Sequence, residues 1–421
     1  MNIKLLVFPC GSEIGLELHR SLSFSRHIEL IGGTSVDDHG EYVFKNIVKN
    51  IPLFSDENFI DYINQLINEY NIDAIYPTMD SVIEKLSKHR SELTCDIIAP
   101  SYNITELCLS KTKTYNLLKS KVLCPQIYVN ESEFNYPMFA KPDIGYGSRG
   151  AKLIQSKHEV AEQLNKYPNT IFCEYLPGEE YTVDCFTRKD GEILFIGARK
   201  RNRVVNGISV STLPIDNEEF VSIINKINDL VGFRGAWFAQ FKRNTSGELA
   251  LLEIAARFGG SSSLHRNMGV NFALLTIFDF YDYPVEVILN KYDTTLDRAL
   301  SNKYKIKINY QNVYIDFDDC LYINDKVNTL LVKFIFQAIN NKKNIILISK
   351  HEGNLKDKLE SLRLYNLFDE IIHLSKSDSK FKYIKSNSSI FIDDSHFERK
   401  QMKDNRDLFV FSPDMVESLL D

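Results

Sequence analysis

A lysine and a glycine-rich loop follow an apolar run in the stretch YPMFAKPDIGYGSRGAKLI, residues 136–154. Glycines let backbone amides approach phosphate oxygens, because no Cβ stands in the way. A lysine ammonium supplies a point charge for the same oxygens. The stretch predicts a phosphate-binding loop, although a plain hairpin loop would have the same composition. The residues concerned are Lys141, Gly145, Gly147, Ser148 and Gly150.

Two oxygen-bearing side chains lie on strands that a short hairpin would join. Gln240 and Glu253 flank the turn at Asn244–Gly247 in QFKRNTSGELALLEIAARFGGSS. Pairing of the two strands can bring both side chains to one face. Oxygen ligands that converge with nucleotide phosphates suit Mg²⁺. The pair therefore predicts a magnesium site.

A basic run, RKRNR, covers residues 199–203. Strand alternation would place Arg199, Arg201 and Arg203 on one face, where they could hold a carboxylate or a phosphate. A solvated edge strand would have the same pattern. We expect the substrate-binding role.

Acidic and hydroxyl residues follow three apolar runs near the C-terminus. Asp316 and Asp318 end VYIDFDD, Ser349 ends IILIS, and Asp393 lies in the paired acids of IFIDD. Strand ends of open α/β sheets are where such sheets place their sites. One carboxylate of an i, i+2 pair can attack phosphorus while the other exchanges a proton. Acidic pairs also cap helices, so a single pair is weak evidence. The prediction of phosphoryl chemistry depends on all of these residues together with a lysine, for which Lys380 is the best candidate.

The elements that must position these residues fall into three domains. Residues 1–105 show a strand–turn–helix opening typical of a small α/β domain. Residues 106–300 predict an α+β domain with antiparallel strands at 137–141, 151–154, 170–174, 181–187, 193–199, 235–242 and 249–255 and helices at 157–166, 217–231 and 271–289. Residues 291–311 are polar and lysine-rich and predict a linker or a peripheral segment. Residues 301–421 return to a parallel β-α-β pattern, with helices predicted at 326–341 and 354–364.

Composition excludes several classes of protein. The 421 residues carry 50 Lys plus Arg against 56 Asp plus Glu, a net charge of −6, so nothing favours nucleic acid or anionic lipid as a partner. Seven scattered cysteines suit reduced thiols in the cytoplasm better than a disulfide framework. The N-terminal apolar run ends at Pro9 and Gly11, too early for a signal peptide, and no run could span a bilayer.

The first 290 residues resemble the ATP-grasp superfamily, in particular the branch of carbamoyl phosphate synthase and biotin carboxylase. Four motifs follow the order of that superfamily: Lys111, the loop Gly145–Gly150, EYLPGEEYTVD and EIAARFGGS. The resemblance implies a pre-ATP-grasp α/β domain, then an ATP-grasp domain, and it implies ATP and Mg²⁺ (or Mn²⁺) as cofactors. It assigns the phosphates to Lys111, Lys141 and the glycine loop, the adenine edge to the backbone of Glu174 and Leu176, and the ribose to Glu180.

The same resemblance implies the reacting groups. Gln240 and Glu253 would hold the magnesium, and Arg257 would stabilise the transferring phosphoryl group. Family members phosphorylate a carboxylate and let an amine attack the acylphosphate. The resemblance also implies that the substrate lies between the loop that carries Ser12 and Glu13 and the central domain. One departure is Ala255, which replaces an asparagine that would ligand a second magnesium.

Residues 312–421 resemble the haloacid dehalogenase superfamily. That resemblance makes Asp316 the nucleophile, Asp318 the general acid/base, and Ser349 and Lys380 the phosphoryl-binding groups. Magnesium would lie among Asp316, Asp318 and Asp393, with Asp394 as a further candidate. Asp318–Ser349 and Ser349–Lys380 are each too short for an inserted cap domain, so we expect a capless Rossmannoid domain.

The sequence as a whole predicts a cytoplasmic bifunctional enzyme. Its partners would be a small carboxylate and an amine, with a homodimer as one open arrangement and no membrane or nucleic acid. Two rivals stay open: a small-molecule kinase of the same fold, and a non-catalytic ATP-binding regulator with a decayed phosphatase domain. Ala255 and Cys320, which replaces a usual threonine, are the features that favour decay.

Overall fold

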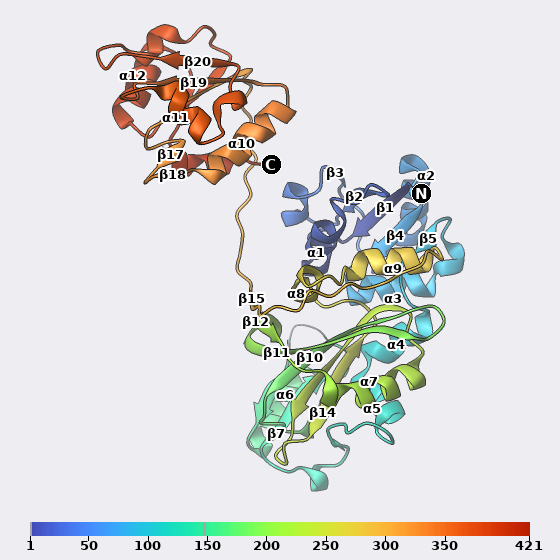
Figure 1. Ribbon diagram of the computed structural model, residues 1–421. Coiled ribbons are helices and arrows are strands. Elements are labelled where there is room, and N and C mark those ends of the chain that lie inside the picture. The colour runs from blue at the N-terminus through green and yellow to red at the C-terminus, as the bar shows by residue number, and fades with distance from the viewer. Residues whose placement is uncertain (1, 146–148) are drawn as a thin grey trace. The chain divides into compact units, whose positions relative to one another are not determined.

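The computed structural model describes residues 2–145 and 149–421 and divides the chain into two compact units, 1–300 and 301–421 (Figure 1). Each unit has sheets and hydrophobic clusters of its own. Among the described residues, no helix combines the length and the apolar character that crossing a bilayer requires.

The first unit begins with a parallel five-stranded sheet in the order β3-β2-β1-β4-β5. Its α1 helix follows the N-cap residue Ser12, whose hydroxyl accepts the Gly15 N–H and so satisfies a free amide of the first turn. The elements are β1 Ile3–Phe8, α1 Glu13–Leu22, β2 Ile28–Gly33, β3 Asn46–Val48, α2 Phe59–Tyr70, β4 Ala74–Pro77, α3 Asp80–Lys88 and β5 Asp96–Ile97.

A four-stranded antiparallel sheet, β6-β9-β7-β8, follows two short helices. These elements are α4 Tyr102–Leu109, α5 Lys111–Leu118, β6 Ile127–Tyr128, β7 Met138–Pro142, β8 Lys152–Ile154, α6 Lys157–Lys166 and β9 Thr170–Glu174.

The largest sheet has the order β14-β13-β10-β11-β12-β15, and its pairs are antiparallel. Its elements are β10 Glu180–Thr187, β11 Ile193–Val205, β12 Ile208–Pro214, α7 Glu218–Val231, β13 Gly235–Arg243, β14 Leu249–Ala255, α8 Ser263–Asn267, α9 Phe272–Phe280 and β15 Leu296–Asp297. Within the segment 291–311, predicted as a linker or a peripheral segment, β15 pairs with β12 and extends this sheet at its edge.

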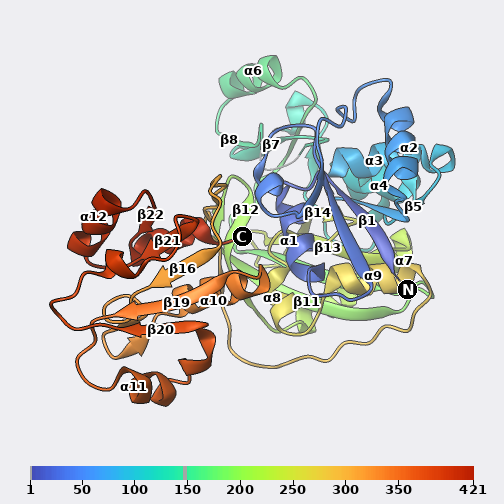
Figure 2. The same ribbon diagram turned by 90° about the horizontal axis from the view of Figure 1, so that it is seen from above.

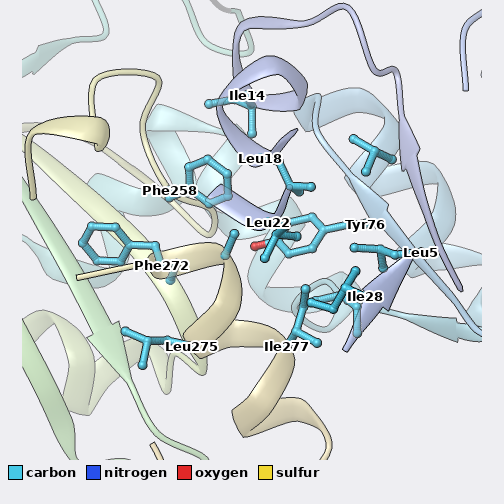
Figure 3. Packing of buried hydrophobic residues seen from close by; sticks show 14 of the residues in the cluster. Leu5, Ile14, Leu18, Leu22, Ile28, Tyr76, Phe258, Phe272, Leu275 and Ile277 are labelled. Atoms are coloured by element: carbon cyan, nitrogen blue, oxygen red, sulfur yellow. The ribbon is translucent and has the colours of Figure 1, made fainter. Parts of the chain in front are cut away.

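Helix α9 packs against α1 of the parallel sheet's layer and against β13 of the largest sheet. Its Phe272, Leu275 and Ile277 share one buried cluster with Leu5 of β1 and Leu22 of α1 (Figure 3). The ribbon in Figure 2 shows the helix beside α1. The helix is shorter than the predicted 271–289. It stops at Phe280, because Asp282 takes a positive φ of 60° and Pro284 disfavours helical backbone before it.

The second unit has a parallel sheet in the order β20-β19-β16-β21-β22 with helices between its strands. The elements are β16 Asn312–Ile315, β17 Tyr322–Ile323, β18 Lys326–Val327, α10 Thr329–Asn340, β19 Asn344–Ser349, α11 Leu355–Ser361, β20 Glu370–His373, β21 Ser389–Ile392, α12 His396–Asn405 and β22 Phe409–Phe411. Short 3-10 helices complete both units at His39–Tyr42, Arg90–Glu92, Glu131–Glu133, Tyr365–Leu367, Lys380–Tyr383 and Pro413–Leu419.

The helix predicted from residue 326 starts later. Strands β17 and β18 form a hairpin instead, with Asn324 and Asp325 as its two loop residues. Both have a positive φ, 48° and 59°, the backbone of a tight hairpin turn that Asn and Asp tolerate well.

Candidate active sites

One cavity of about 520 Å³ in the first unit gathers most of the predicted ligase residues. Strands β7, β9, β10, β11, β13 and β14 and the loop before α1 all contribute to its lining. Among the predicted residues, the lining includes Ser12, Glu13, Lys111, Lys141, Gly145, Glu174, Leu176, Glu180, Arg199, Arg201, Gln240, Glu253 and Arg257. Ala255 lies on the same wall.

Two buried lysines face this cavity without a carboxylate partner in the described part of the chain. Lys141 Nζ donates to the Tyr115 hydroxyl at 2.8 Å, and Lys111 Nζ donates to the Asp143 carbonyl at 3.2 Å. Burial lowers the pKa of Lys141, because the charged form loses hydration. Two ammonium groups without an anionic contact fit the phosphates of a nucleotide.

Part of the glycine loop lies outside the described residues, namely Gly147 and Ser148. Gly145 lines the cavity, and its carbonyl lies 3.5 Å from Lys111 Nζ. Gly150 has a φ of +74°, which favours glycine, and its carbonyl accepts a 2.7 Å hydrogen bond from Gln163.

Glu174 and Leu176 lie where β9 ends and the chain turns toward β10. Leu176 is buried, and the Glu174 N–H donates to the Gln126 carbonyl at 2.9 Å. Glu180 starts β10 beside them. All three residues line the cavity.

Gln240 and Glu253 are directly opposite each other in the β13–β14 pair, as predicted from the hairpin. The Arg201 guanidinium lies between this pair and β10, since its Nη1 donates to both Gln240 Oε1 and Glu180 Oε1. Arg201 therefore joins the predicted metal ligand to the predicted ribose ligand. The two oxygen-bearing side chains and the nearby lysines suit a magnesium ion bound together with phosphates.

Arg199 forms a buried charge network with Asp184 and His265. Its Nε donates to Asp184 Oδ2 at 2.7 Å, and His265 Nδ1 lies 3.0 Å from the same oxygen. Burial by itself would raise the pKa of Asp184, but the Arg199 charge and the His265 hydrogen bond outweigh it and lower the pKa to about 2. Arg199 Nη1 is buried and has no hydrogen-bond partner among the described residues.

Loss of the Asp184 carboxylate should destabilise the first unit. Asp184→Asn leaves Arg199 buried without its counter-charge, so we expect the free energy of unfolding at pH 7 to fall by about 3–5 kcal/mol. Because the folded pKa lies below the ordinary 3.8, this contribution is present above pH 3.8 and disappears as the pH falls toward 2.

Urea denaturation followed by tryptophan fluorescence measures this change. Trp237, the single tryptophan, is fully buried on β13 in the same unit. Asp282→Asn, which removes an exposed partner of Lys189, is the matched control and should leave the curve unchanged. An Asp184→Asn curve equal to that of the wild type at pH 7 would contradict the prediction.

The expectation that three arginines share one strand face fails at Arg203. The β11–β12 register shifts between Arg201 and Arg203, so the simple alternation ends there. Arg203 is exposed, forms an ion pair with Asp297 at 2.8 Å and is absent from the cavity lining. Arg199 and Arg201 remain as the arginines of β11 that face the cavity.

Two lining residues of the cavity, Glu13 and Ser261, contact an arginine that is not among its described lining residues. Arg298, just after β15, contacts Glu13 and donates to Ser261 Oγ at 3.2 Å. A side chain at Gly260 would collide with Glu13, so the chain passes unusually close there. The sequence placed Arg298 in a predicted linker or peripheral segment. It did not indicate Arg298 as a site residue, because its partners Glu13 and Ser261 are remote in the sequence.

Arg257, the predicted phosphoryl-stabilising residue, pairs with Asp80 at the start of α3. Its Nε and Nη2 donate to the two Asp80 oxygens at 2.6 and 2.7 Å. A bidentate pair of this kind fixes the plane of the guanidinium. Ser12 is likewise engaged, since its hydroxyl donates to Thr78 Oγ1 at 2.8 Å while it caps α1.

The second unit gathers its predicted residues at the carboxyl ends of β16, β19 and β21. Lys380 Nζ lies 2.8 Å from Asp316 Oδ1 and 2.6 Å from Asp393 Oδ2. Burial and the Asp316 charge raise the pKa of Asp393 to about 7. One oxygen each from Asp316, Asp393 and Asp394 lies within 4.8 Å of the others, which fits a divalent cation. Asp318, also predicted as a metal ligand, is not in this cluster of described residues.

Asp318 and Ser349 flank that cluster. Ser349 is buried at the end of β19, and its hydroxyl accepts the His351 N–H at 3.2 Å. Asp318 is half exposed and faces the His351 imidazole, with Nδ1 at 2.9 and 3.0 Å from its two oxygens. His351 was missed by sequence reasoning, although it lies two residues after a predicted site strand.

The fold of the chain is similar to the folds of solved carboxylase, synthetase and ligase structures. Biotin carboxylase from Campylobacter jejuni in complex with β-γ-ATP aligns with a TM-score of 0.57 at 14% identity, over 68% of this chain and 73% of that one. N5-carboxyaminoimidazole synthetase from Staphylococcus aureus, with ADP, gives 0.56 at 18%, over 69% and 81%. L-amino acid ligase from Bacillus licheniformis gives 0.55 at 18%, over 68% and 75%.

The sequence of the chain matches one protein family and several relatives over part of its length. Residues 166–296 match the family described as ATP-grasp in the biosynthetic pathway with Ter operon. D-alanine–D-alanine ligase from Thermotoga maritima is 33% identical over 98 residues, 21% of this chain and 32% of that protein. Carbamoyl-phosphate synthase from Methanobrevibacter smithii is 22% identical over 186 residues, 37% and 51% of the two chains. The matches thus span a third to a half of these relatives.

Proposed function

We propose that the first unit is an ATP- and magnesium-dependent ligase that joins a small carboxylate to an amine or a similar nucleophile. The observation that carries the proposal is the convergence of Lys141, Gln240 and Glu253 on one cavity. A relative and a structural neighbour named as ligases support it. Two further neighbours, a carboxylase and a synthetase, were solved with an ATP-type nucleotide and with ADP. The family match favours a biosynthetic role.

The proposed reaction has two steps. A substrate carboxylate oxygen attacks the γ-phosphorus of ATP, and ADP leaves. The amine then attacks the acyl carbon, and the bond between that carbon and the phosphate-bearing oxygen breaks. Phosphate leaves with this oxygen, which came from the carboxylate. Lys111 and Lys141 would neutralise the phosphates, Gln240 and Glu253 would hold Mg²⁺, and Arg257 would stabilise the transferred group. Bound magnesium would supply further charge neutralisation at the phosphates.

Arg199 is the strongest candidate for the substrate carboxylate. Asp184 and His265 fix the guanidinium, and its buried Nη1 still lacks an acceptor among the described residues. A buried donor without a partner is costly, so a carboxylate that reaches it gains a charge-assisted hydrogen bond. Glu13 on the same cavity offers a carboxylate to the amine.

For the second unit we propose phosphate-ester hydrolysis through an aspartyl-phosphate. Asp316 would attack phosphorus, and Ser349 and Lys380 would hold the phosphoryl oxygens. Three clustered carboxylates, two of them paired with Lys380, support a Mg²⁺ site beside them. The substrate would be related to the substrate or product of the ligase.

ADP release tests the ligase proposal. Purified full-length protein with ATP and Mg²⁺ is screened against pairs of carboxylic acids and amines, and we expect one pair to stimulate release. Mass spectrometry of the product separates two chemistries. Condensation loses water, whereas a kinase would add a phosphate and need no amine. Failure to bind ATP, measured by calorimetry, would overturn both.

A further inference from the structure

His351 connects the two ends of the site in the second unit. Its ring approaches both oxygens of Asp318, at 2.9 and 3.0 Å, and its backbone N–H donates to the Ser349 hydroxyl. One residue therefore contacts the proposed acid/base and the proposed phosphoryl-binding group. This link is a property of the fold, because β16 and β19 are adjacent in the parallel sheet.

The imidazole itself is held on several sides. Its side chain is 17% exposed, while that of Asp318 is 47% exposed. The Phe317 ring packs against it edge-on, with centroids 5.1 Å apart. The His351 carbonyl accepts a 2.8 Å hydrogen bond from His373 Nε2, which fixes the loop after β19. A half-exposed carboxylate is thus anchored by a well-packed ring.

We infer that His351 is a positioning residue for the phosphatase reaction, which holds the Asp318 carboxyl toward the phosphoryl group. This inference rests on the phosphatase function proposed for the second unit. A side chain on a loop loses catalytic efficiency when it samples several rotamers, and a fixed hydrogen-bond donor removes that freedom. With the proton on Nδ1, the His351 ring would donate to Asp318 in this way.

The chemistry gives the pair a defined task. As an Asp316 oxygen bonds to phosphorus, the bond from phosphorus to the ester oxygen breaks. The Asp318 carboxyl gives its proton to that oxygen, which leaves as the alcohol. Asp318, now ionised and still hydrogen-bonded to His351, later takes a proton from the water that hydrolyses the aspartyl-phosphate. Phosphate is released, and both carboxyl groups return to their starting state.

Leaving-group dependence distinguishes positioning from a merely structural role. A poor leaving group such as phenolate needs the general acid, whereas 2,4-dinitrophenolate leaves without one. We expect His351→Leu to lower kcat/KM for phenyl phosphate by about 10-fold or more, a share of the 10²–10⁴ that a positioned acid contributes. For 2,4-dinitrophenyl phosphate the loss should be under about 3-fold, since formation of the phosphoenzyme then needs little protonation.

The assay uses full-length protein with Mg²⁺ and two comparison variants. His351→Gln, whose amide can donate to Asp318, should recover most of the activity on phenyl phosphate. His158→Leu, at a side chain 83% exposed in the first unit, should match the wild type. Equal losses on both esters, or no loss, would overturn the positioning role alone. A wild type that hydrolyses neither ester would overturn the phosphatase function and this inference together.

Discussion

Asp316→Asn should abolish phosphate-ester hydrolysis by the full-length protein. Asp316 lies at the end of β16, within 2.8 Å of Lys380 and inside the carboxylate cluster. An amide cannot form the aspartyl-phosphate, so we expect a fall in kcat of more than about 10⁴-fold, the scale seen when a hydrolase loses its nucleophile.

Hydrolysis of 2,4-dinitrophenyl phosphate, followed by absorbance, measures this loss. Asp407→Asn, at a side chain 97% exposed, is the matched control and should keep full activity. Retained hydrolysis in Asp316→Asn would show that another group is the nucleophile. Thermal unfolding of both variants separates lost chemistry from lost structure.

Lys141→Met should remove ATP-dependent turnover in the first unit. The lysine is buried, and its ammonium has a hydroxyl partner, Tyr115, rather than a carboxylate among the described residues. Removing the ammonium therefore leaves no paired carboxylate without its counter-charge, while a bound triphosphate loses a buried positive charge. We expect kcat/KM for ATP to fall by more than about 10²-fold, as when a group that stabilises transition-state charge is deleted.

ADP release, with the substrate pair found by screening, reports the effect. Lys226→Met, an exposed lysine on α7, is the control. Binding of an ATP analogue should weaken in Lys141→Met and not in Lys226→Met. Equal turnover in both variants would mean that Lys141 does not contact the nucleotide.

The local sequence pattern was sufficient to predict several strands and helices. The predicted strands 170–174 and 249–255 occur with those limits as β9 and β14, and the helix 157–166 occurs as α6. Apolar periodicity and turn residues determine such elements over a few neighbouring positions. The pairing of Gln240 with Glu253 followed in the same way, because a short hairpin fixes the register.

Errors arose where remote contacts or irregular backbone decide the structure. Nothing near Arg298 in the sequence indicates Glu13 as its partner. The register shift beside Arg203 turns that residue away from the cavity, and alternation cannot reveal a bulge. At Asn324 and Asp325 a turn signal was present, since both residue types tolerate positive φ, but the helical period of the following residues concealed it.

The position of Arg298 has a practical consequence for anyone who dissects this chain. The family match ends at residue 296, which would be the natural place to end a minimal fragment. A fragment that stops there lacks the guanidinium that neutralises Glu13 on the cavity wall. Such a fragment would also cut β15, the edge strand that pairs with β12, and would present an uncompensated acid to an incoming anion, so its recombinant boundary belongs beyond Arg298.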